Sequence, residues 1–204
     1  MEKTLFMVHA RIEQRCVLVI VGLALTITSY AQWNIKGGLD LSSLTSSSDV
    51  KSEMGFHLGV GYDVPLSSKF YFQPGILFAS NGFDFKSTYI VEKASVSMYA
   101  LEIPLDFSFR PQISNNIKLV TEFGMFVRYG LFGNKKYIFT DSEMLKESSF
   151  QAYNRFDTGA NLGIGLAYDN LALICFYQFG FLDVEKAIDK LKHKKIRLSI
   201  NYMF

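Results

Sequence analysis

The sequence is poor in cysteine and proline and has no strong excess of either charge. Its 204 residues include two cysteines and four prolines, and the formal net charge is +2. Two cysteines cannot provide the disulfide framework that holds many small secreted domains together. A near-neutral chain gives no reason to expect a nucleic-acid partner. No cysteine and histidine spacing suggests a metal site, so neither a metal nor another cofactor is expected.

A long apolar run occurs only near the N-terminus. Residues 16–28, CVLVIVGLALTIT, are uncharged and apolar, and a leader with three basic residues precedes them. The run is shorter than the ~20 residues that a membrane-spanning helix needs. Residues 29–31, SYA, follow with the small residues that signal peptidase reads. We predict a cleaved signal peptide over residues 1–31, with a helical membrane anchor as the weaker alternative, and one domain over residues 32–204.

The predicted mature chain contains segments in which apolar and polar residues alternate. In the last of them, KKIRLSINYMF, Ile196, Leu198 and Ile200 share one side, while Arg197 and Ser199 share the other. Successive side chains of a strand point to opposite faces, so this pattern predicts strands with one apolar face. Eight such segments occur, at residues 33–41, 55–64, 70–79, 99–110, 118–129, 155–168, 171–181 and 194–204.

The connections between these segments alternate between long and short. The long ones are residues 42–53, 81–96, 132–154 and 182–194, and the short ones are 65–69, 111–116 and 169–170. Short periplasmic turns opposite long outer loops are typical of outer-membrane barrels. We therefore predict an all-β fold, an eight-stranded antiparallel up-and-down transmembrane β-barrel in the cell outer membrane.

The two strand faces indicate what surrounds the barrel. A soluble barrel of the lipocalin type places its apolar face inside. Here the polar face is rich in glycine, which suits a crowded interior, and its charges are balanced in sign. The apolar face ends in aromatic residues at both rims, as at the two surfaces of a membrane. We expect a structural charge network inside the barrel, formed by Lys36, Asp40, Asp63, Glu102, Asp106, Arg110, Glu122, Arg128, Arg155, Asp157, Lys195 and Arg197.

His57 is the one candidate for catalysis on a predicted strand. Small outer-membrane enzymes such as lipid A deacylases use a serine and a histidine within hydrogen-bonding reach of each other. No serine is obviously placed beside His57, whose side chain is predicted to point inward. We interpret His57 as part of the interior network, assign no catalytic residue and do not expect an enzyme. Because side chains can fill an eight-stranded barrel, an open channel is not expected either.

A family resemblance is carried by three stretches: FQPGILFASNGF at 72–83, YALEIPLDFSF at 99–109 and RFDTGANLGIGLAY at 155–168. They resemble the PorT-type outer-membrane β-barrel family of Bacteroidetes. The resemblance implies an integral outer-membrane protein with a structural or interaction role, as an accessory of an envelope or secretion complex. The aromatic Tyr202 and Phe204 resemble the terminal signal that the barrel-insertion machinery recognises.

The expected partners are therefore outer-membrane lipid and lipopolysaccharide, the insertion machinery during assembly, and an envelope protein. Two other functions remain open from the sequence. One is a small transporter or pore, and the other is a lipid-modifying outer-membrane enzyme.

Overall fold

The computed structural model describes residues 32–44, 50–85, 91–139, 144–149, 154–183 and 192–204. The predicted signal peptide lies outside the described residues. Within the described ranges, no helix is long and apolar enough to cross a membrane. The strands in these ranges are β1 Gln32–Leu44, β2 Val50–Pro65, β3 Phe70–Phe85, β4 Val91–Phe109, β5 Gln112–Ser114, β6 Ile117–Phe139, β7 Met144–Ser148, β8 Phe156–Tyr168, β9 Leu171–Gly180 and β10 His193–Met203.

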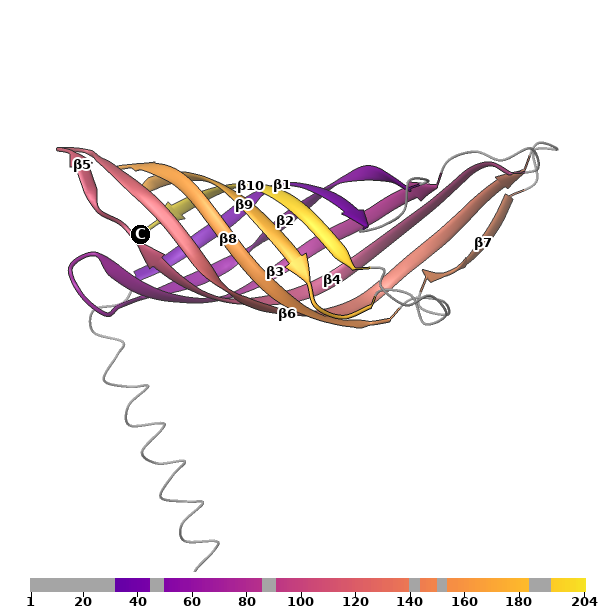
Figure 1. The fold of residues 1–204 in the computed structure, drawn as a ribbon, viewed down its shortest axis with the longest axis horizontal. Coiled ribbons are helices and arrows are strands. Elements are labelled where there is room, and N and C mark those ends of the chain that lie inside the picture. Colours follow the sequence, from indigo (N-terminus) through magenta and orange to yellow (C-terminus); the bar gives the residue numbers. More distant parts are fainter. Residues whose placement is uncertain (1–31, 45–49, 86–90, 140–143, 150–153, 184–191) are drawn as a thin grey trace, which may run out of the picture. The chain divides into compact units, whose positions relative to one another are not determined.

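Eight of these ten strands close into an antiparallel barrel (Figure 1). The ring runs β1, β2, β3, β4, β6, β8, β9, β10, and β10 pairs back onto β1. The two short strands β5 and β7 pair with β6 outside this ring. Closure leaves no open sheet edge along the wall, which satisfies the backbone where no water is available. The predicted eight-stranded barrel is confirmed.

The strands on the long-loop side are longer than the sequence predicts. The predicted loop 81–96 is wrong over most of its length, because β3 continues to Phe85 and β4 already begins at Val91. In the same way β6 continues to Phe139 and pairs there with β7. Strict alternation is required only where one strand face meets lipid. Beyond that level the pattern fades while the hydrogen-bonded hairpins continue.

The predicted two-residue turn between β8 and β9 is confirmed. Tyr168 ends β8 and Leu171 begins β9. Asp169 has a φ of 48°, the left-handed conformation that a tight two-residue hairpin requires. The side chain of Asn116 in the neighbouring turn donates a hydrogen bond to Asp169 Oδ1 at 2.7 Å. The short turns therefore brace one another at this rim.

The two faces of each strand differ in exposure as the alternation predicts. On β10, Ile196 and Leu198 are 50% and 46% exposed, whereas Lys195 and Arg197 are 3% exposed. Apolar side chains thus cover the outside and charged side chains lie inside. Outward aromatic rings also pair at the two ends of the barrel. The ring centres of Trp33 and Tyr62 lie 5.0 Å apart at the short-turn end, and those of Tyr99 and Phe132 lie 4.9 Å apart at the long-loop end.

A small apolar core fills part of the interior. Ile174 and Phe176 break the alternation of β9 because their side chains point inward, where they join Val120, Ala167 and Ala172. The ring of Phe176 lies directly over Gly163 of β8, where a Cβ atom would come within 2.6 Å of it. Gly163 therefore makes room for Phe176 in the narrow interior.

Candidate functional site

Most of the charged residues predicted to face the interior are buried there. Arg110 is half-buried, and Arg155 departs from the expectation. Arg155 precedes β8, is exposed, and donates to the backbone carbonyl oxygens of Gly130 and Leu131. Because Arg155 precedes the first residue of β8, the alternation of inward and outward side chains along that strand does not include it. The ten buried residues are Lys36, Asp40, Asp63, Glu102, Asp106, Glu122, Arg128, Asp157, Lys195 and Arg197.

Two arginines and two carboxylates form the centre of the interior network. Arg197 donates from Nη1 to Glu102 Oε1 at 2.7 Å, and from Nε to Asp40 Oδ1 at 2.9 Å. Arg128 donates from Nη2 to the second oxygen of Glu102 at 2.8 Å. Lys195 reaches Asp40 Oδ2 at 3.0 Å. Each ion is therefore paired in a place where an unpaired charge would cost several kcal/mol.

The pair Arg197–Glu102 crosses the full width of the barrel. Arg197 lies on β10 and Glu102 on β4, and four steps around the ring separate these strands in either direction. At this level a direct hydrogen bond therefore joins opposite walls of the barrel across its interior. The interior of an eight-stranded barrel is narrow enough for such a bond to form.

Amides and further carboxylates extend the network along the barrel. Gln178 donates to Glu102 Oε1 at 3.1 Å and to Asn161 Oδ1 at 2.8 Å, and Asn161 donates to Asp106 Oδ1 at 3.0 Å. Asp157 accepts from Arg128 at 3.1 Å. These bonds join four strands, β4, β6, β8 and β9, so they hold the wall together from within.

A second cluster lies at the short-turn end and is centred on Asp63. Its carboxylate accepts from Asn34 at 2.7 Å, from Arg110 at 2.6 Å and also from Gln73. The guanidinium of Arg110 stacks 4.6 Å from the ring centre of Tyr71. This cluster ties β1, β2, β3 and β4 together where the barrel meets its short turns.

The remaining predicted residues lie near these clusters. Glu122 accepts a hydrogen bond from Ser108 at 3.2 Å. Lys36 and Asp106 are both buried in the interior. Outside the barrel, the exposed rings of Tyr202 and Phe204 lie 5.1 Å apart, and Phe204 N donates to Trp33 O. The aromatic end of the chain is thus fixed to the first strand.

His57 has a serine partner that the sequence did not suggest. His57 Nε2 lies 3.0 Å from Ser199 Oγ, and His57 Nδ1 lies 2.9 Å from Asp40 Oδ1. Ser199 Oγ also lies 2.7 Å from Asn201 Oδ1. The serine has one hydroxyl proton, so it can donate to only one of these two neighbours. All of these side chains are buried inside the barrel.

The register explains why His57 and Ser199 meet although β1 lies between their strands. Gly38 of β1 pairs with His57 on one side and with Ser199 on the other. Because Gly38 has no side chain, the imidazole passes over it, and a Cβ atom there would lie 3.0 Å from the imidazole Cε1. The sequence contained one signal for this contact. Gly38 is a glycine on the inward face of β1, which lies between the two strands that carry His57 and Ser199.

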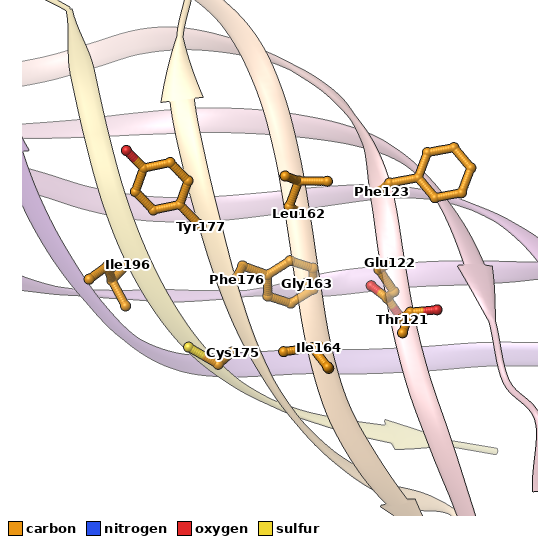
Figure 2. Close-up of a pocket in the computed structure, with 10 residues that line it drawn as sticks. All are labelled: Thr121, Glu122, Phe123, Leu162, Gly163, Ile164, Cys175, Phe176, Tyr177 and Ile196. Carbon is orange, nitrogen blue, oxygen red and sulfur yellow. The ribbon is translucent and has the colours of Figure 1, made fainter.

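A hollow of about 510 Å³ lies on the outer surface over β6, β8, β9 and β10. Figure 2 shows its lining side chains, among them Phe123, Leu162 and the free Cys175. The lining is almost entirely apolar, as expected for a surface covered by acyl chains. In the part of the chain that the structure describes, no group of three or more histidine, cysteine or acidic residues could hold a metal ion.

A closed barrel with apolar side chains outside and paired charges inside defines an integral outer-membrane β-barrel protein. The chain belongs to the family described as outer membrane protein beta-barrel domain, whose model matches residues 13–185. The protein is therefore located in the outer membrane, where its outer face contacts lipid.

Several solved structures are similar to this chain. The attachment invasion locus protein Ail of Yersinia pestis is 18% identical, with 85% of this chain and 99% of that chain covered and a TM-score of 0.43. OprG from Pseudomonas aeruginosa is 13% identical, with 85% and 96% covered and a TM-score of 0.48. A major outer membrane protein from Thermus thermophilus is 14% identical, with 85% and 99% covered and a TM-score of 0.49. No curated protein matches the sequence.

Proposed function

We propose that this protein is a non-conducting, non-enzymatic barrel that serves as a structural or interaction component of the outer membrane. The observation that supports this most strongly is the bond between Arg197 and Glu102, since it places two buried side chains across the interior of a narrow barrel. A barrel with bonded side chains across its interior can act through the parts that extend beyond the membrane.

The long hairpins are the candidate interaction surface. The strands β4 and β6 have 19 and 23 residues, whereas a tilted strand needs only ~9–11 residues to cross the membrane. The excess lies on the long-loop side, where β3, β4, β6 and β7 continue as a paired sheet. The right-hand part of Figure 1 shows β6 and β7 extending there. A rigid sheet of this kind offers a surface to an envelope partner without the entropic cost of ordering a loop.

The resemblance to the PorT-type family supports one kind of partner, a component of a protein-secretion complex. We also propose that residues 1–31 are removed as a signal peptide during export. In assembly, Tyr202 and Phe204 are proposed to act as the signal for the barrel-insertion machinery. Lipopolysaccharide is the proposed lipid neighbour on the long-loop side.

Site-specific cross-linking tests the interaction role. A photo-reactive residue at Asn134, exposed on the extended part of β6, is expected to capture one defined envelope protein in living cells. The same residue at Ile113, exposed in the opposite short turn, is the matched control and should not capture it. Capture of lipid alone from Asn134 and from its neighbour Lys136 would contradict the proposal.

A lipid-modifying enzyme is the second candidate, because Ser199, His57 and Asp40 have the order of contacts found in serine hydrolases. Burial speaks against it, since Ser199 is only 1% exposed. A Ser199→Ala variant separates the two functions. Loss of a lipid acyl chain in cells that express the wild-type protein, but not in cells that express the variant, would establish the enzyme.

A further inference from the structure

The pairing between β10 and β1 closes the ring, and these two strands lie side by side although they come from opposite ends of the chain (Figure 1). In a hairpin, the connecting turn fixes the register of the two strands. No turn connects β10 to β1, because β1 begins at Gln32 and β10 ends at Met203. The register at this β10–β1 seam must therefore be fixed by contacts between the strands themselves.

The outer face of the seam does not distinguish between neighbouring registers. A slip of one residue would turn the apolar side of β10 inward, but a slip of two residues keeps every side chain on its own face. Leu39 would then meet Ile196 or Ile200, which are as apolar as its partner in the structure. β1 also contains two consecutive glycines, Gly37 and Gly38, and register is weakly specified in glycine-rich strands. The discrimination has to come from the inner face.

Inside the barrel, Asp40 of β1 lies directly opposite Arg197 of β10. The guanidinium of Arg197 donates two hydrogen bonds to this carboxylate, from Nε to Oδ1 at 2.9 Å and from Nη2 to Oδ2 at 3.0 Å. Lys195, also on β10, donates to Oδ2 at 3.0 Å, and His57 Nδ1 of β2 lies 2.9 Å from Oδ1. Asp40 is only 1% exposed. A two-bond contact between arginine and carboxylate is geometrically specific, and its loss in a buried place is costly.

A slip of two residues would break the two-bond contact. It would move β10 by about 6.8 Å along β1. Asp40 would then lie opposite Ser199 for a slip in one direction and opposite Lys195 for a slip in the other. In both cases the residue of β1 opposite Arg197 would be a serine or a glycine, and neither carries a charge. The inner face therefore favours the observed register over both of its neighbours.

We propose that Asp40 is a positioning residue for barrel closure, which selects through Arg197 the register in which β10 pairs with β1. The register at the seam sets the stagger of the strands around the ring, and the stagger is tied to the strand tilt and the diameter of the barrel. Asp40 thereby also decides which inward side chains meet across the interior, including Arg197 and Glu102. The inference needs only the closed barrel and is independent of the proposed function.

Disulfide trapping reads the register at the seam directly. In the full chain, with the two native cysteines replaced by serine, Leu39→Cys is combined with Ile196→Cys, Leu198→Cys or Ile200→Cys. The Cα atoms of directly opposite residues lie about 4.5–5.5 Å apart, within reach of a disulfide, whereas those of diagonal residues lie about 7–8 Å apart and out of reach. Position 198 is opposite position 39 in the structure, so a bridge between them is the native bridge. Bridges from position 39 to 196 or 200 are slipped bridges.

The protein is refolded into lipid vesicles and oxidised with copper phenanthroline, and the gel mobility of the unfolded chain measures each bridge. With Asp40 present, only the native bridge is expected. Asp40→Asn removes the charge at nearly the same size and is expected to give a slipped bridge at a yield similar to that of the native one. A folded Asp40→Asn variant that forms the native bridge alone would overturn the proposal.

Glu122→Gln is the matched control, because it also neutralises a buried carboxylate but lies on β6, away from the seam. It should form the native bridge alone. Slipped bridges in Glu122→Gln would overturn the proposal, because loss of any interior carboxylate would then loosen the register.

A second measurement applies if Asp40→Asn does not assemble. The disulfide is then formed in the unfolded chain before refolding, so that it supplies the register covalently. The native bridge is expected to restore assembly of Asp40→Asn. The slipped bridge to position 200 closes a loop of almost the same length, so its entropic gain is similar, but it should not restore assembly. Equal rescue by both bridges, or rescue by neither, would show that Asp40 contributes stability and does not select the register.

Discussion

His57 Nε2 lies 3.0 Å from Ser199 Oγ, although the strand β1 separates the two strands that carry them. Gly38 lies between these residues in the register and makes the contact possible. The interior of the barrel therefore depends on glycine positions as much as on charged ones. A side chain at Gly38 would also collide with the backbone oxygen of Leu198.

Gly38→Ala is expected to destabilise the barrel by about 1–3 kcal/mol, the usual cost of overpacking a filled interior. The new Cβ atom must displace His57 or the backbone of β10. Urea unfolding in detergent micelles, followed by tryptophan fluorescence, measures the change in the free energy of unfolding. Gly37→Ala is the matched control, because a Cβ atom at that neighbouring position meets only Leu58 Cδ1 at 3.3 Å and a backbone oxygen at 3.6 Å. Equal loss of stability in both variants would contradict this explanation.

Glu102→Gln is expected to destabilise the barrel by about 3–5 kcal/mol, because it removes the buried carboxylate charge that Arg128 and Arg197 share. Glu102 is fully buried and accepts from Arg128, Arg197 and Gln178. The same unfolding measurement tests this, with Lys118→Gln at an exposed position as the control. A change below about 1 kcal/mol, as for exposed ion pairs, would mean that the network contributes little to stability.

Wild-type protein is expected to be silent in planar bilayers, since Arg197 and Glu102 bond to each other across the interior. Replacing Arg128 and Arg197 together by alanine removes both guanidinium groups from this level. The double variant should conduct, and it should prefer cations because Asp40, Glu102 and Asp157 remain. Single-channel recording measures conductance and ion selectivity, with Arg155→Ala, outside the interior network, as the control. Steady conductance of the wild-type protein would contradict the proposed function and favour a pore.

A nitroxide label on Cys175 is expected to be more accessible to oxygen, which concentrates in lipid, than to a water-soluble nickel chelate. Cys175 is exposed on the outer face of β9, in the hollow of Figure 2. Power-saturation electron paramagnetic resonance measures both accessibilities in lipid vesicles, with Cys16 replaced by serine. A label at Ile113→Cys, in the Cys175→Ser background, should show the reverse preference, because this turn faces water. Equal accessibility at both positions would show that lipid does not cover β9.

The alternation along the chain was sufficient to predict the number of barrel strands and the direction in which their side chains point. Lys195 and Arg197 are buried and Ile196 and Leu198 are exposed, as the period of two requires. The ends of the strands were predicted less well. The extensions of β3, β4 and β6 lie beyond the lipid, where nothing in the hydrophobic pattern marks a strand.

The partners inside the barrel were beyond the reach of the sequence. Arg197 bonds to Glu102 from 95 residues away, and Ser199 contacts His57 from 142 residues away. These pairs depend on which strands stand opposite one another and on the register between neighbours. Arg155, which was expected inside, is exposed because it precedes the first residue of β8.

The sequence by itself therefore determined the class of the molecule, because hydrocarbon outside a strand demands apolar residues at every second position. Only the tertiary structure decided which charges meet, which side chains cross the interior, and where the register between β2 and β3 shifts. Those features follow from closure of the ring and from the stagger of its strands, and neither is written in any single segment.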